Sequence, residues 1–153
     1  MNTQNDSIFV TRFTKAVLDV LFVLGILGTV SLPWSLRWAS TLYPSLGEHI
    51  TAQTLLLMCC GVGAVAIIFE LRRMFGTVLA HNCFVQQNII SLRRMGYFAL
   101  GIALCSAVRL LLVCTPATLL IIGVFFLASL FSFVLSQVFD RAVRYKEEND
   151  LTI

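Results

Sequence analysis

Four long apolar stretches alternate with short basic clusters along the chain. The stretches cover about residues 16–34, 51–71, 97–113 and 117–138. Each is close to the ~20 residues that an α-helix needs to cross a hydrocarbon core of ~30 Å. With 58% hydrophobic and 12% charged residues, the chain is too apolar for a soluble domain, in which about 25% of residues are charged. The sequence therefore predicts an all-α membrane protein, a four-transmembrane-helix bundle that forms one domain over residues 1–153.

Nine of the eleven Lys and Arg residues fall on one predicted side of the membrane. These nine are Arg12, Lys15, Arg72, Arg73, Arg93, Arg94, Arg141, Arg144 and Lys146. Cytoplasmic loops of membrane proteins are enriched in Lys and Arg, so both termini and the connection between the second and third spans are expected in the cytoplasm. No basic cluster is dense enough for a nucleic-acid surface, which argues against direct nucleic-acid binding.

The segment between the second and third spans carries two arginine pairs, Arg72–Arg73 and Arg93–Arg94. Apolar residues recur at helical spacing on both sides of position 82. This pattern predicts a cytoplasmic helical hairpin, in which the second helix runs past the membrane, turns and returns as an amphipathic helix. The two arginine pairs would then sit at one height. They form either an interfacial girdle that faces phosphate headgroups or a docking site for an acidic partner.

Small residues at helical spacing predict that neighbouring helices pack closely. They include Gly25, Gly28, Gly61, Ala64, Ala99, Ala103 and Ala107. Ser129, Ser132 and Ser136 share one face of the fourth span, where interhelical hydrogen bonding is the expected role and a binding or pore role is the alternative. Thr115 and Pro116 predict a tight turn, which makes the third and fourth spans antiparallel neighbours.

Three charges fall within the apolar spans or at their edges, where an ionisable group costs about 2.5–3.5 kcal/mol at the bilayer centre. Asp19 and Glu70 lie near the cytoplasmic ends of the first and second spans. A local ion pair is the expected arrangement for them, since Glu70 is beside Arg72 and Arg73 in the sequence. Arg109 lies about one turn from the outer end of the third span, where its side chain extends to the interface or contacts a ligand.

Residues 139–153 form a polar tail after the fourth span. Asp140 and Arg144 are spaced as an i, i+4 ion pair, so the helix is expected to continue to about Glu148. The end of the tail is a candidate partner contact, with a loosely packed terminus as the alternative. The residues concerned are Lys146, Glu147, Glu148, Asn149, Asp150, Leu151, Thr152 and Ile153.

The chain lacks the residue patterns of the common catalytic sites. It has no Gly-rich phosphate loop, HExxH motif or paired catalytic carboxylates, so we expect no enzyme and no cofactor. Five cysteines without a CxxC pair give no disulfide framework, and His81 with Cys83 is too small a set for a structural metal site. An enzyme that uses His81 or Cys83 is the weakest alternative.

Two phrases carry a resemblance to a known family. One is Phe84-x-x-x-Asn88-x-x-x-Leu92-Arg93-Arg94-x-Gly96, and the other is the ending, residues 146–153. On these phrases and its hydropathy outline, the chain resembles the small bacterial four-pass membrane proteins catalogued as domain of unknown function 2975. It departs from them at His81, Asn82 and Cys83, where a turn with Gly or Pro is expected.

The resemblance implies a multi-pass protein of the bacterial cytoplasmic (inner) membrane. Members of that family often accompany a small helix-turn-helix regulator, which implies a soluble cytoplasmic partner, and the family lends no catalytic residues. The expected function is therefore a non-enzymatic regulatory or adaptor protein that contacts its partner through the four paired arginines and the tail. The alternative is a small transporter, channel subunit or immunity protein against membrane-active peptides, centred on Arg109 and the serine face. A homo-oligomer is a further option.

Overall fold

Four α-helices make up nearly all of the computed structural model, which describes residues 3–42, 50–79, 86–112 and 114–150. They are α1 (Thr3–Leu42), α2 (Ile50–Leu79), α3 (Gln86–Leu112) and α4 (Pro116–Asp150). At 1.5 Å per residue, even α3, with 27 residues, is about 40 Å long and exceeds the ~30 Å hydrocarbon core. All four helices are long and apolar enough to cross a membrane, so the chain is a multi-pass membrane protein.

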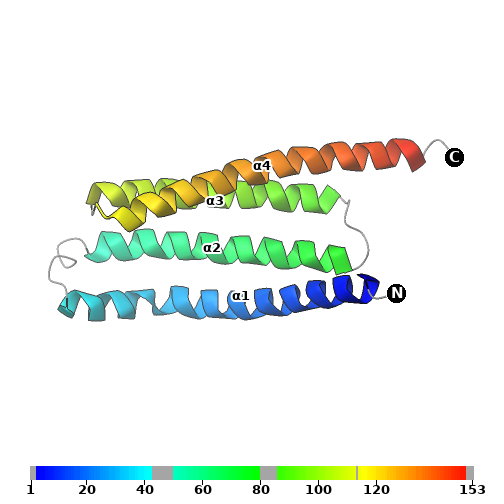
Figure 1. The fold of residues 1–153 in the computed structure, drawn as a ribbon. Helices are drawn as coiled ribbons and strands as arrows, with labels where there is room; N and C mark the ends of the chain where they lie inside the picture. Colours follow the sequence, from blue (N-terminus) through cyan, green and yellow to red (C-terminus); the bar gives the residue numbers. More distant parts are fainter. Residues whose placement is uncertain (1–2, 43–49, 80–85, 113, 151–153) are drawn as a thin grey trace.

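Successive helices pack antiparallel and side by side in chain order, and α4 crosses over α3 (Figure 1). Extensive contacts within the described residues join only α1 with α2, α2 with α3 and α3 with α4. The prediction of four membrane-spanning helices is confirmed, but they form an open row with α1 and α4 at its edges. Lipid tails are as apolar as the helix surfaces, so no hydrophobic force closes such a row into a compact bundle.

Small residues let neighbouring helices approach closely, as the sequence predicted for Gly61, and Gly96 does the same without having been predicted. A Cβ atom added to Gly61 of α2 would lie 2.8 Å from the Thr29 hydroxyl of α1, and one added to Gly96 of α3 would lie 2.9 Å from the Phe133 ring of α4. Gly28 is different, because open space surrounds the position of its missing Cβ. It therefore does not contribute to close packing, contrary to the expectation for it.

Large apolar side chains cover the outer surfaces of the row. Leu111 is 86% exposed and Phe131 is 68% exposed, and many similar side chains on all four helices are also exposed. These surfaces suit contact with the hydrocarbon of a lipid bilayer.

The helix α1 continues through Pro33 and ends at Leu42. The first predicted span ended at about residue 34, so residues 35–42 extend the helix beyond it. Proline removes one backbone hydrogen bond, but its φ angle is compatible with a helix, and in membrane helices neighbouring groups compensate for the lost bond.

The turn between α3 and α4 is the one that the sequence predicted. The Thr118 N–H donates to the Thr115 carbonyl oxygen at 3.0 Å, and the hydroxyls of these two residues are 2.7 Å apart. Pro116 is the first residue of α4, a position where its missing N–H has no helical acceptor to lose.

We call the two ends of the row the basic end and the opposite end. At the basic end, α1 and α3 begin and α2 and α4 end, so both termini lie there (Figure 1, right). The helices α2 and α3 extend along the two arms of the predicted hairpin. Its turn, near position 82, lies outside the described residues.

Candidate functional site

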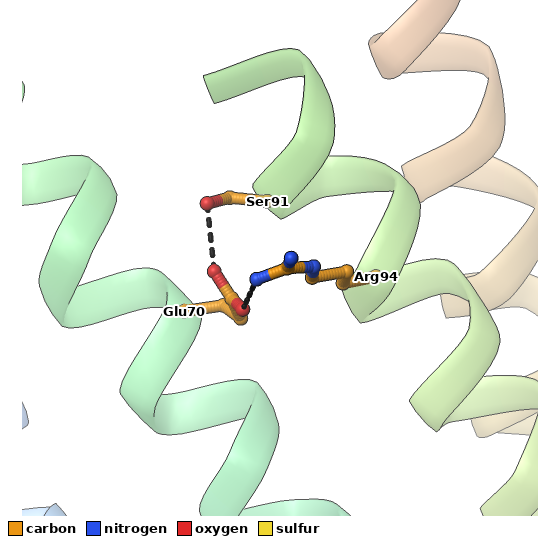
Figure 2. A network of polar contacts seen from close by, with 3 residues as sticks. All are labelled: Glu70, Ser91 and Arg94. Carbon is orange, nitrogen blue, oxygen red and sulfur yellow. Dashed lines mark hydrogen bonds and ion pairs between the residues drawn. The ribbon is translucent and has the colours of Figure 1, made fainter. Parts of the chain in front are cut away.

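A buried carboxylate joins α2 to α3 at the basic end (Figure 2). The Ser91 hydroxyl donates to one oxygen of Glu70 at 2.7 Å, and the Arg94 guanidinium pairs with the other at 3.3 Å. The Glu70 side chain is 5% exposed, whereas that of Arg94 is 53% exposed. A carboxylate in such a place is stable only when its charge and its hydrogen bonds are compensated, and α3 supplies both groups from successive turns.

A second polar contact between the same helices lies closer to the end of α2. The Thr77 hydroxyl donates to Asn88 Oδ1 at 2.9 Å, and Asn88 is only 1% exposed. On α2, Thr77 is seven residues after Glu70, and on α3, Asn88 is three residues before Ser91. Both spacings place the partners on one helix face, so a polar seam runs along the α2–α3 interface here.

The helix α1 is tied to α2 by Asp19 and Arg72. Arg72 Nε donates to Asp19 Oδ1 at 2.6 Å, and the Arg72 guanidinium carbon lies 4.6 Å from the centre of the Phe22 ring. Phe22 also packs against Phe69 of α2, with 6.1 Å between the ring centres. The arginine thus combines an ion pair with a cation–π contact on one neighbouring helix.

The structure corrects the expected ion pair of Glu70. The partner of Glu70 is Arg94 of α3, and neither Arg72 nor Arg73 pairs with it. Arg72 is two residues from Glu70 on the same helix, so the two side chains point in different directions. Arg73 faces the Gln87 amide of α3. When the amide is oriented with its oxygen toward Arg73, that oxygen accepts from Arg73 Nε at 2.6 Å.

The four paired arginines therefore have different surroundings. Arg72 and Arg94 are held in ion pairs with neighbouring helices, and Arg73 faces an amide. Arg93 is exposed. Arg73 and Arg94 are exposed as well, so three of the four arginines contribute positive charge to the surface at this end.

The other residues of the family-like phrase hold α3 in place. Asn88 and Leu92 are buried, and Gly96 gives room to Phe133. Phe84 lies outside the described residues. The described residues of this phrase, Asn88, Leu92 and Gly96, therefore form a packing motif.

The helix α4 extends to Asp150, slightly beyond the predicted end at Glu148. Asp140 and Arg144 form the predicted i, i+4 pair at 3.3 Å. Val143 is 3% exposed, so the extension is packed against the structure at least this far. Tyr145 is 71% exposed, and residues 146–149 are exposed as well. The side chain of Asp150 and residues 151–153, also predicted to contact a partner, lie outside the described part of the chain.

The structure separates the groups on which the transport alternative relied. Ser129 and Ser136 are buried in the α3–α4 interface. Phe133 of α4 lies against Gly96 of α3. Ser129 is one turn before Phe133, and because the two helices are antiparallel it is level with about position 100 of α3. Arg109 is about nine residues, or about 13 Å, further along α3. These serines and Arg109 do not form one site.

Sequence reasoning missed the residues that complete the network, namely Ser91, Thr77 and Gln87. A signal was present, because Glu70 and Thr77 repeat at seven residues on one helix, while Asn88 and Ser91 repeat at three on the next. Polar residues at such spacing in apolar helices predict a buried polar seam. Which helix face meets which could not be read from that spacing.

The chemistry of the network is that of a structural clamp. Both oxygens of the buried carboxylate have partners, the Ser91 hydroxyl and the Arg94 guanidinium. No group of three or more His, Cys, Asp or Glu residues in the described ranges is arranged to hold a metal ion. The four described cysteines are free thiols. The arrangement holds α1, α2 and α3 in register at the basic end.

Comparisons with known proteins place the chain by family. No curated protein and no solved structure matches it. Residues 30–153 match the family model described as "Protein of unknown function (DUF2975)". The match covers the second part of α1 and all of α2, α3 and α4, as the sequence resemblance predicted. The chain therefore belongs to the DUF2975 family of proteins of unknown function.

Proposed function

We propose that the chain is a non-enzymatic adaptor of the bacterial cytoplasmic membrane that presents its basic end to a soluble cytoplasmic protein. The observation that carries the proposal is the extension of α4. It is packed at Val143 and then exposes Tyr145 and residues 146–149, where one basic residue, Lys146, is followed by two acidic ones, Glu147 and Glu148. An exposed, helical and charged segment on a packed base is suited to binding a protein partner.

The ion pairs at the basic end support this role. Arg72 with Asp19 and Arg94 with Glu70 hold three helices in register, so the surface beside the extension is preorganised. Preorganisation lowers the entropy cost of binding. The partner implied by the family resemblance is a small helix-turn-helix regulator, whose own DNA contacts would remain separate from this membrane protein.

The first test is affinity capture from a cytoplasmic extract with the full chain in nanodiscs. Deletion of residues 146–153, combined with Arg93→Gln and Arg141→Gln, removes exposed groups without breaking the Glu70 or Asp19 pairs. We expect the captured soluble protein to be lost with these variants and retained with Arg37→Gln at the opposite end. Equal capture by the full chain and the combined variant would refute the proposal.

The second test is orientation. In a cysteine-free variant, Lys146→Cys and Ser40→Cys place single thiols at the two ends of the row. With a membrane-impermeant maleimide on intact cells, we expect labelling at position 40 and protection at position 146 until the membrane is opened. Labelling of position 146 in intact cells would exclude a cytoplasmic partner.

A further inference from the structure

Arg109 is a partly buried cation that has no acceptor among the described residues. It lies in the last turn of α3, at the opposite end of the row. Its Nε atom is buried and has no hydrogen-bond partner, and no described residue forms an ion pair with its guanidinium. The arginines Arg72 and Arg94 at the basic end each have a carboxylate partner, so the state of Arg109 is not general for this chain.

The surroundings of Arg109 are polar on the side that faces α2. Ser106, three residues earlier on α3, is 5% exposed, and its hydroxyl lies 3.9 Å from the Cys60 sulfur of α2. This spacing of three residues places Arg109 and Ser106 on one face of α3. Gln53 is 2% exposed and lies seven residues before Cys60, on the same face of α2 and nearer the end of the row.

These groups are donors, and what they lack is an anion. A guanidinium presents five N–H groups in a planar fork that matches the oxygens of a phosphate. The Gln53 amide and the Ser106 hydroxyl add neutral donors. The helices α2 and α4 also begin at this end, and their N-termini favour negative charge. The C-terminal dipole of α3 compensates the arginine only partly, because it offers partial charges and no ionised acceptor.

We infer that Arg109 is a binding site for a phosphate oxyanion at the opposite end of the α2–α3 interface, with Gln53 and Ser106 as neighbouring donors. The phosphate comes either from the headgroup of an anionic phospholipid or from solution. Either source supplies the missing counter-charge. This site is separate from the partner-binding surface proposed for the basic end.

The experiment uses the full chain, delipidated in detergent, with three probes: phosphatidylglycerol, phosphatidylcholine and inorganic phosphate. Bound lipid is counted by native mass spectrometry, and phosphate binding is followed by calorimetry. We compare the wild type with Arg109→Gln, Arg109→Lys and, as a control, Arg37→Gln. Arg37 is exposed at the same end and lines an open hollow of about 260 Å³ with Pro33.

We expect phosphatidylglycerol to bind the wild type and Arg37→Gln alike, and to bind Arg109→Gln at least about tenfold more weakly. Arg109→Lys should be intermediate, because it keeps the charge and loses the fork. Loss confined to the lipid probes identifies a headgroup site, and a parallel loss with inorganic phosphate identifies a soluble anion. If the wild type and a folded Arg109→Gln bind each of the three probes with the same affinity, the inference is overturned.

Discussion

At the basic end of the helix row, two carboxylates each meet an arginine from the next helix, whereas at the opposite end Arg109 meets no acceptor among the described residues. Asp19 pairs with an arginine across the α1–α2 interface, and Glu70 pairs with one across the α2–α3 interface. Both ends hold charges in apolar helices, but only one end uses them as links. A charge becomes a link when the neighbouring helix places its counter-charge at the same level, and otherwise it stays available for a ligand.

The largest effect is expected from removing the cation of the buried pair. Arg94→Leu leaves the Glu70 carboxylate with only the Ser91 hydroxyl. We expect a loss of about 2 kcal/mol, less than for a fully buried pair because Arg94 is half exposed. Thermal unfolding in detergent measures the loss. Arg93→Leu, at the adjacent exposed position, should change the melting temperature little, and adding Glu70→Gln to Arg94→Leu should restore most of it.

The next effect compares two buried serines. Ser91→Ala removes the donor to the Glu70 carboxylate, and we expect it to cost about 1.5 kcal/mol, since hydrogen bonds to charged groups are strong. Ser106→Ala loses only a 3.9 Å contact with a thiol, a weak partner, and should cost less than about 0.5 kcal/mol. Equal melting temperatures for the two variants would contradict the difference between the ends.

A smaller effect is expected for the pair between α1 and α2. Both side chains are about a third or more exposed, so Asp19→Asn should cost only about 0.5 kcal/mol. Arg72 keeps its contact with the Phe22 ring in that variant. Arg72→Leu loses both contacts and should therefore be more destabilising than Asp19→Asn. Denaturation curves of the two variants test this order, and the reverse order would show that the ring contact contributes nothing.

The smallest effect on stability is expected at Arg109. Arg109→Leu removes a buried N–H donor, Nε, that has no acceptor among the described residues, so the melting temperature of delipidated protein should stay the same or rise slightly. A loss as large as that of Arg94→Leu would mean that Arg109 has an internal partner, and the contrast between the ends would fail. The same thermal assay serves for all four comparisons.

The fold was predictable as far as it depended on local pattern. Apolar length predicted four helices, and Thr115 with Pro116 predicted the tight turn before α4. The i, i+4 pair of Asp140 and Arg144 was also predictable, because both residues belong to one helix. The continuation of α1 beyond Pro33 was not predictable, because a proline near a span boundary is compatible with both a loop and a helix.

The site was predictable only in part. The sequence identified Asp19, Glu70 and the arginine pairs as unusual charges, and it assigned Glu70 to the arginines nearest in sequence. The true partner, Arg94, is on another helix. Helical rotation places residues two apart on different faces, and the relative rotation of α2 and α3 depends on contacts such as that of Ile102 with Gly63. No single-helix pattern contains that information.

By itself, the sequence determined a four-pass helical membrane protein, because hydrophobic length and composition act on each helix separately. The tertiary structure decided that the helices form an open row, that Glu70 and Asp19 act as clamps, and that Arg109 has no acceptor among the described residues. These outcomes depend on which faces meet and at what level, and in a bilayer that choice rests on close packing and polar pairing, because burial of apolar surface gives no preference.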